Sequence, residues 1–265
     1  MVGQCLPFWE ARGLRTEVVA GPAPRAGRVG ILHVDLTHVP TDYEPLRAAY
    51  PVLLNGTVAD IGKRKVSPEL TVGRDDLYDG PVIVKTDLNA RGVPERRARR
   101  HEQAWPARVA ANVLDRLMPR RPTGRWWRWD RPYPAYPRKS AVPGWVWRRP
   151  DLVVQRFVPE PAGPGYVLRI WYFLGDVDLH LARYAHDPWF AGGRGTQAAL
   201  LGEVPPELRD FRARWGFDLG KFDYVLSEGR PVLLDANKTP SFGLGATPFH
   251  GAALPRLAES IERWL

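Results

Sequence analysis

Two aspartates and an asparagine lie in the strands of one predicted hairpin, residues 222–237. Asp223 belongs to its first strand, and Asp235 and Asn237 belong to its second. Because side chains alternate between the faces of a strand, Asp235 and Asn237 point the same way. Asp223 shares their face if the turn at Glu228 has an odd number of residues, whereas a two-residue turn sends it to the opposite face.

Three oxygen ligands on one face would suit a hard cation such as Mg²⁺, whose remaining ligands can be phosphate oxygens. The alternative is an ordinary hairpin with solvated acids. Aspartate is disfavoured within strands, and this favours the metal site.

A lysine ends another predicted strand, residues 80–86, which is mostly apolar and carries Lys85. Only six of the 38 basic residues are lysines, so a lysine here suggests a need for a compact ammonium group. At the end of an apolar strand this group would face a cleft of reduced dielectric, where it binds a phosphate oxygen strongly. The alternative role is a structural salt bridge.

The order of these motifs resembles the ATP-grasp family of enzymes, over about residues 55–242. In that family an acid, about a dozen intervening residues and then an acid-x-Asn motif followed by Pro hold the magnesium ions on ATP. The resemblance implies that the metal ligands are Asp223, Asp235 and Asn237, and that Lys221 points towards the γ-phosphate.

The resemblance also implies the contacts to the nucleotide. Lys85 matches the phosphate-binding lysine of the family, and Lys63 is favoured over Lys65 as the second nucleotide lysine. Residues 152–160 resemble the hinge between the two lobes. The nucleotide contacts expected there are Gln155, the backbone of Phe157 and Val158 at adenine, and Glu160 at the ribose, although Arg156 stands where the family often has an acid.

Two arginines match positions that the family directs towards the transferred phosphoryl group and the substrate. They are Arg169 and Arg183, and the alternative for each is an exposed sheet residue. The glycine-rich lid is the weakest match, because residues 86–92 contain one glycine where the family has several. Asn89 or Arg91 would have to compensate.

The predicted architecture is α/β, an ATP-grasp fold that holds the nucleotide between two α+β lobes. We expect a short N-terminal α/β lobe at residues 1–76, a central lobe at 77–157 and a C-terminal lobe with the metal site at 158–265. The C-terminal lobe should contain an antiparallel sheet, a helix at 206–215 and a closing helix at 254–265. Pro106 should interrupt the helical pattern of residues 95–118, and residues 120–150 read as an ordered loop or lid.

Composition favours a globular protein of a reducing compartment. The 265 residues are 44% hydrophobic, enough for a sizeable core. Cys5 is the only cysteine, so an intramolecular disulfide and a thiolate metal cluster are excluded. No segment has the roughly 18 apolar residues of a membrane span, and no export signal is evident. We therefore expect a cytoplasmic protein.

The net charge of +9 could attract nucleic acid, an acidic membrane surface or an anionic small substrate. The arginine run at 96–100 and the Trp/Arg stretch at 125–131 could bind single-stranded nucleic acid. We favour a solvated helix face and a packed lid for them, and expect neither a nucleic-acid nor a membrane partner. His33, Asp35 and His38 follow a predicted strand, so they are candidates for the acceptor site.

The preferred function is that of an ADP-forming, ATP-dependent carboxylate-amine ligase with ATP and Mg²⁺ as cofactors. An acyl phosphate forms on a small-molecule or peptide carboxylate and is attacked by an amine. The alternatives are a kinase-like phosphotransferase of the same fold and a non-catalytic basic nucleic-acid-binding module. The identity of the acceptor and the oligomeric state do not follow from the residues.

Overall fold

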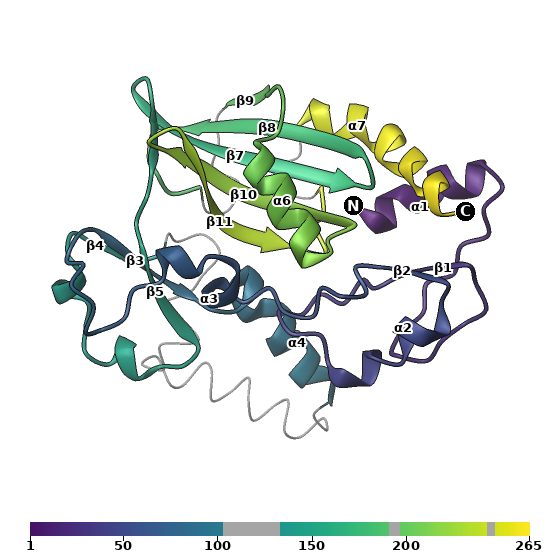
Figure 1. Ribbon diagram of the computed structural model, residues 1–265, viewed down its shortest axis with the longest axis horizontal. Coiled ribbons are helices and arrows are strands. Elements are labelled where there is room, and N and C mark those ends of the chain that lie inside the picture. Colours follow the sequence, from purple (N-terminus) through teal and green to yellow (C-terminus); the bar gives the residue numbers. More distant parts are fainter. Residues whose placement is uncertain (103–132, 191–196, 243–246) are drawn as a thin grey trace. The chain divides into compact units, whose positions relative to one another are not determined.

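The computed structural model describes residues 1–102, 133–190, 197–242 and 247–265 (Figure 1). They divide into two compact units. The first combines Met1–Ile61, Val158–Pro188 and Gly195–Leu265, and the second combines Gly62–Phe157 and Trp189–Arg194. The predicted break at Pro106, the Trp/Arg stretch at 125–131 and part of the loop at 120–150 lie outside the described residues. The division into three lobes stays a prediction.

The first unit is built on an antiparallel sheet in the order β11-β10-β7-β8-β9, and β6 pairs with the first three residues of β7. Its strands are β6 (Glu160–Ala162), β7 (Gly165–Leu174), β8 (Val177–Ala185), β9 (Gln197–Leu200), β10 (Leu219–Ser227) and β11 (Arg230–Asn237). The α/β class and the antiparallel sheet predicted from the sequence are confirmed.

Helices cover both faces of this sheet because its long strands are apolar on both sides. Ile170 and Tyr172 of β7 pack with α1 (Val2–Ala11) and α7 (Pro248–Glu259) in one hydrophobic core. On the opposite face, α6 (Pro206–Trp215) places Phe211 edge-on against Phe222, with ring centroids 5.3 Å apart. Figure 1 shows α7 beside α1 and α6 on the sheet.

The predicted helix at 206–215 is confirmed, whereas the prediction for the closing helix was wrong at its start. The closing helix begins at Pro248 instead of residue 254, and residues Ser260–Trp264 form a 3-10 turn, η7. Proline is well tolerated in the first turn, and Thr247 and His250 cap the helix reciprocally. The sequence analysis did not predict α1, whose Trp9 indole donates to the carbonyl of Ala258 at 2.8 Å.

The segment before residue 61 contributes a small parallel pair to the first unit. β1 (Val29–Ile31) pairs with β2 (Val52–Leu54). Between these strands the chain forms a 3-10 turn, η1 (Thr41–Tyr43), and a short helix, α2 (Leu46–Ala49). No helix in the described part of the chain has the length and apolar character needed to cross a bilayer.

The second unit contains a three-stranded antiparallel sheet in the order β4-β3-β5. Its strands are β3 (Val82–Thr86), β4 (Ala135–Tyr136) and β5 (Leu152–Arg156). Val82, Val84 and Val154 turn into its hydrophobic core. Short helices complete the unit, namely α3 (Lys63–Val66), η2 (Pro68–Leu70), η3 (Asn89–Gly92), α4 (Val93–Glu102), η4 (Lys139–Ala141) and η5 (Val146–Arg148).

Asn55 ties the end of β2 to the start of β10. Its side chain is buried, donates to the carbonyl of Leu219 at 2.9 Å and accepts from the backbone N–H of Asp218 at 2.9 Å. Its φ of 56° is in the left-handed region, which Asn tolerates better than most residues. This one side chain therefore holds the N-terminal segment against the large sheet.

We expect Asn55→Ala to lower the free energy of unfolding by about 3 kcal/mol, because buried backbone groups lose their partners and Ala is strained at positive φ. Asn55→Gly removes the same hydrogen bonds but accepts the backbone conformation, so its loss should be smaller. Urea unfolding of the parent and the two variants measures both contributions, the lost hydrogen bonds and the backbone strain. An Ala variant within 1 kcal/mol of the parent would contradict the assigned role.

Candidate functional site

The turn between β10 and β11 has two residues, Glu228 and Gly229, since Ser227 pairs with Arg230. Such a turn alone would put Asp223 and Asp235 on opposite faces. The register shifts between Asp223 and Tyr224, however, so that Tyr224 lies opposite Leu233 while Asp223 lies opposite Asp235.

Leu234 is the residue that this shift leaves over on β11. One extra residue in one strand is a β-bulge, which changes the face to which the following side chains point. The bulge thus brings Asp223, Asp235 and Asn237 to the same face, although the turn has an even number of residues. Lys221 lies opposite Asn237 and shares that face.

A partly buried ion pair joins two of these residues. The Lys221 ammonium donates to Asp223 Oδ2 at 2.8 Å, with 21% and 16% of the two side chains exposed. Burial alone would lower the pKa of Lys221, but the charge and hydrogen bond of Asp223, together with Tyr172 and Asp235, outweigh burial and the pKa is raised. Lys221 is therefore held as an ammonium.

The two carboxylates outnumber the lysine. Burial raises the pKa of Asp223, the Lys221 ammonium opposes this rise, and the negative charge of Asp235 adds to it. Asp223 Oδ1 is buried and accepts no hydrogen bond from any residue that the structure describes, and Asp235 Oδ1 is buried as well. The face consequently brings two carboxylates and their acceptor oxygens close together.

Three further side chains surround this face. Tyr172 lies opposite Lys221, and Arg183 on β8 is close enough to lower the pKa of Asp223 electrostatically. The positive charges of Arg183 and Lys221 both lower the pKa of His250. The pKa of His250 is lowered, first by burial, and its Nδ1 accepts from the backbone N–H of Thr247 at 2.8 Å. The neutral ring therefore carries its proton on Nε2.

The sequence analysis did not identify Tyr172 and His250 as site residues. A histidine three residues after Thr247, at the start of an apolar helix, is a variant of the capping box that the sequence could have revealed. Tyr172 gives no signal of its own within an aromatic strand.

Asn237 is held by the residues that follow it. Its Oδ1 accepts from the backbone N–H of Thr239 at 2.8 Å, and the Thr239 hydroxyl donates to Asp35 Oδ1 at 2.8 Å. Asp35 is thereby linked to Asn237 through Thr239. It was one of the three candidates for the acceptor site.

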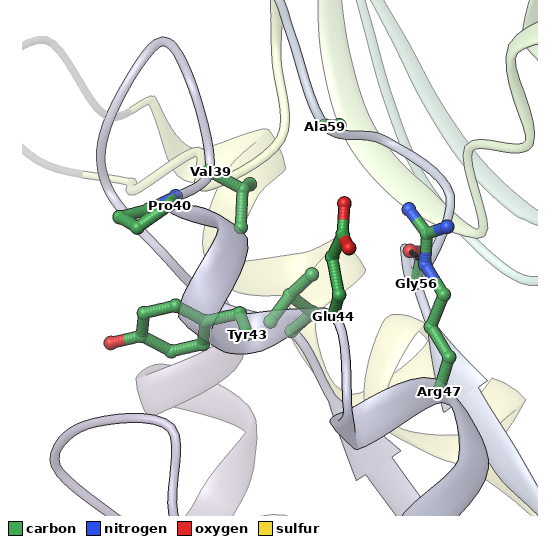
Figure 2. Close-up of a pocket in the computed structure, with 8 residues that line it drawn as sticks. Val39, Pro40, Tyr43, Glu44, Arg47, Gly56 and Ala59 are labelled. Atoms are coloured by element: carbon green, nitrogen blue, oxygen red, sulfur yellow. Dashed lines mark hydrogen bonds between the residues drawn. The ribbon is translucent and has the colours of Figure 1, made fainter.

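The other two acceptor candidates lie in the same segment. His38 is exposed and its Nδ1 lies 3.1 Å from Asp60 Oδ1. His33 is also exposed. Figure 2 shows a small pocket farther along this segment, with Tyr43, Glu44 and Arg47 among its lining residues.

Arg169 and Glu160 lie apart from the acids. Arg169 is opposite Tyr224, so it occupies the other face of the sheet from Asp223. Its guanidinium donates to both Glu160 oxygens, at 2.6 and 3.0 Å. Glu160 Oε2 also accepts from the backbone N–H of Leu226 at 2.6 Å. The structure brings Arg183 to the acids but joins Arg169 to Glu160.

The remaining predicted nucleotide contacts belong to the second unit or its boundary. Lys85 lies opposite Val153 on the face of the small sheet that points away from its valine core, and Gln155 shares that face. The Gln155 amide is buried and donates to the carbonyl of Lys63 at 3.4 Å. Its Oε1 has no hydrogen-bond partner among the described residues.

Lys63 and Lys65 differ in burial. Both lie in α3, but Lys63 is buried and its Nζ donates to the carbonyl of Leu88 at 3.4 Å, whereas Lys65 is exposed. Phe157 ends the second unit and stacks on Trp189 with ring centroids 4.9 Å apart, and Val158 begins the first unit.

The lid predicted at residues 86–92 departs from a glycine-rich loop. Ala90 and Arg91 have φ values of 44° and 59°, and Gly92 has 67°. Two non-glycine residues thus adopt a conformation that glycine adopts without strain. The Arg91 side chain is buried and lies over the Tyr133 ring, 4.2 Å from its centroid.

The donor set on the large sheet fits a magnesium ion. Magnesium prefers oxygen ligands, few of them from protein when phosphates are present. Asp223 Oδ1 is a buried carboxylate oxygen that accepts no hydrogen bond from the described residues, and Asp235 and Asn237 supply oxygens on the same face. Lys221 occupies only Oδ2 of Asp223.

No protein-family model and no curated protein sequence matches this chain. A search of solved structures gives 53 matching chains. One is described as a RimK domain protein ATP-grasp from Sphaerobacter thermophilus, with 14% identity, a TM-score of 0.46, and coverage of 98% of this chain and 94% of that one.

Two further matches are partial. The D-alanine–D-alanine ligase from Bacillus anthracis complexed with ATP has 12% identity and a TM-score of 0.30, over 69% of this chain and 50% of that one. The macrocyclase MdnC from Microcystis aeruginosa bound with precursor peptide MdnA has 12% identity and a TM-score of 0.31, over 42% of this chain and 33% of that one. This chain thus spans half or less of these two proteins. Similarity at this level does not transfer their reactions or substrates.

We expect Asp235→Asn to weaken the pH dependence of stability in the metal-free protein. Because the folded pKa of Asp223 is above the unfolded value of 3.8, the folded state retains a proton that the unfolded chain has lost. The free energy of unfolding therefore falls as the pH rises through that window. Without the Asp235 charge the interval between the folded and unfolded pKa values narrows, and the fall in the free energy of unfolding should be smaller.

Thermal melts in EDTA between pH 4 and 7 measure this difference. Glu228→Gln is the matched control, because it removes an exposed acid from the same hairpin. An Asp235→Asn protein with the same pH slope as the parent would show that the two acids do not interact as described.

Proposed function

We propose that this chain is an ATP-grasp protein that uses ATP and magnesium to activate a carboxylate for attack by an amine. The observation that carries the proposal is the β-bulge at Leu234, which gathers Asp223, Asp235 and Asn237 on one face beside Lys221. A solvated hairpin has no need of this arrangement, because acids facing water can point either way.

Each residue of the face has a separate task. Asp223 Oδ1, Asp235 and Asn237 hold magnesium, which neutralises charge on the triphosphate and so supports phosphoryl transfer. Lys221 neutralises Oδ2 of Asp223 and directs its remaining N–H groups towards the γ-phosphate. Arg183, from strand β8 on the far side of β7, adds positive charge where the phosphoryl group passes to the substrate.

The nucleotide contacts follow from the resemblance of the sequence motifs. Lys85 binds a phosphate oxygen, and Gln155, with the backbone of Phe157 and Val158, meets the base. Between the two lysines of α3 we retain Lys63, whose buried ammonium is shielded from water, over the exposed Lys65.

Glu160 takes the ribose in this proposal, and its ion pair with Arg169 fixes the carboxylate. Arg169 therefore acts through Glu160 instead of touching the phosphoryl group. This differs from the role expected for Arg169 from the family pattern, and the bidentate contact to Glu160 supports the change.

The reaction is an ADP-forming ligation. The carboxylate oxygen attacks the γ-phosphorus as the bond to the β-phosphate oxygen breaks, which gives an acyl phosphate and ADP. An amine then attacks the acyl carbon, releases inorganic phosphate and loses a proton to form the amide. The segment that holds His33 and Asp35 lies in the same unit as the acids and is the proposed acceptor platform.

Mg-ATP should raise the melting temperature of the protein by about 5 °C at 100 times its dissociation constant, since native-state binding contributes about 2.7 kcal/mol at that excess. ATP in EDTA should raise it less. Asp235→Asn should reduce the part of this rise in melting temperature that depends on magnesium, whereas Glu228→Gln should not. An unchanged melting curve in millimolar Mg-ATP would contradict the nucleotide site.

Product analysis tests the reaction itself. Mass spectrometry after incubation with ATP, magnesium and a metabolite pool should reveal an amide product, and ADP release then measures turnover. Asp235→Asn should release ADP at less than a tenth of the parent rate, a barrier change above about 1.4 kcal/mol. A stable phosphorylated product would instead indicate the kinase-like alternative.

A further inference from the structure

The side-chain oxygen of Asn237 has two positions for hydrogen-bond donors or a cation. The backbone N–H of Thr239 takes one of them at 2.8 Å. The Thr239 hydroxyl is the competitor for the other, because it lies only 3.3 Å from Asn237 Oδ1. A hydroxyl that donated to Asn237 would fill the position that a metal ion needs.

Asp35 resolves this competition. A hydroxyl has one proton, and the Thr239 hydroxyl lies 2.8 Å from Asp35 Oδ1 but 3.3 Å from Asn237 Oδ1. The shorter contact is also the stronger one, because its acceptor is a carboxylate. The proton therefore goes to Asp35, and one acceptor position of Asn237 stays open.

We propose that Asp35 is a positioning residue for the metal site: by accepting the Thr239 hydroxyl proton, it keeps one acceptor position of Asn237 available to the cation. The inference rests on the proposed function, because it concerns the same magnesium site. It assigns a task to a residue from the loop after β1, which is 204 positions from Thr239 in the sequence.

Two other roles for Asp35 make different predictions. Its charge could attract the cation through space, in which case any neutral residue would weaken metal binding. Its contact with Thr239 could merely hold the loop in place, in which case removal of the hydroxyl would be as harmful as removal of Asp35. The two atoms of the contact can be varied separately to distinguish these roles.

The measured quantity is the gain in affinity for a non-hydrolysable ATP analogue that Mn²⁺ provides, as the ratio of dissociation constants without and with the metal. Asp35→Ala frees the Thr239 hydroxyl to donate to Asn237, so we expect about a tenfold loss of that gain, in the range for residues that orient metal ligands. Asp35→Asn retains an acceptor oxygen and should stay near the parent.

Thr239→Val removes the competing hydroxyl and should also stay near the parent. The decisive protein is the double variant Asp35→Ala with Thr239→Val, in which no hydroxyl remains to block Asn237. We expect it to recover the metal-dependent gain that Asp35→Ala loses. A double variant as weak as Asp35→Ala, or an equally weak Asp35→Asn, would overturn the proposal in favour of a charge effect.

A Thr239→Val protein as weak as Asp35→Ala would also overturn it, in favour of a structural contact. The parent protein gives the full metal-dependent gain in affinity, and Asn237→Ala gives the gain that remains without the ligand oxygen. If Mn²⁺ provides the parent with no gain, the magnesium site of the proposed function fails and this inference fails with it. If the parent shows the gain and Asp35→Ala matches it, only the role of Asp35 is disproved.

Discussion

The close approach of two carboxylates on one face of the large sheet is the constraint on which the candidate site depends. Asp223 and Asp235 lie opposite each other on paired strands, where like charges repel, and Lys221 supplies one ammonium for two carboxylates. Burial raises the pKa of Asp223, and the charge of Asp235 adds to this rise. An arrangement that costs stability in this way is understandable if a cation completes it.

The backbone maintains this arrangement through two local features that compensate for each other. A two-residue turn joins the strands of the hairpin and by itself would place Asp223 and Asp235 on opposite faces. The bulge at Leu234 brings the two acids back to the same face. Glu228 adopts a φ of 51° in that turn, a conformation that glycine or asparagine adopts at lower cost. The strands after the bulge then continue in a regular register to Lys221 and Asn237.

Segments distant in sequence supply the support around the site. Asn55 binds the backbone at Asp218 and Leu219, directly before the strand that carries Lys221. Asp35 reaches Thr239 from the same N-terminal segment. The N-terminal residues are therefore part of the unit that contains the acids, and their hydrogen bonds fix the two ends of the hairpin.

The sequence by itself determined the α/β class, the antiparallel sheet, the helix at 206–215 and the shared face of Asp235 and Asn237, because these depend on local periodicity and on short spacings. It could not decide the face of Asp223, since parity along one strand does not reveal a bulge in its partner. It also assigned Arg169 and Arg183 similar tasks, although pairing across the sheet places Arg183 near the acids and Arg169 against Glu160. Tyr172, and the contacts that bring His250 to Tyr172 and Asp35 to Thr239, emerged only from the tertiary structure, because contacts between distant segments form through packing that no local pattern encodes.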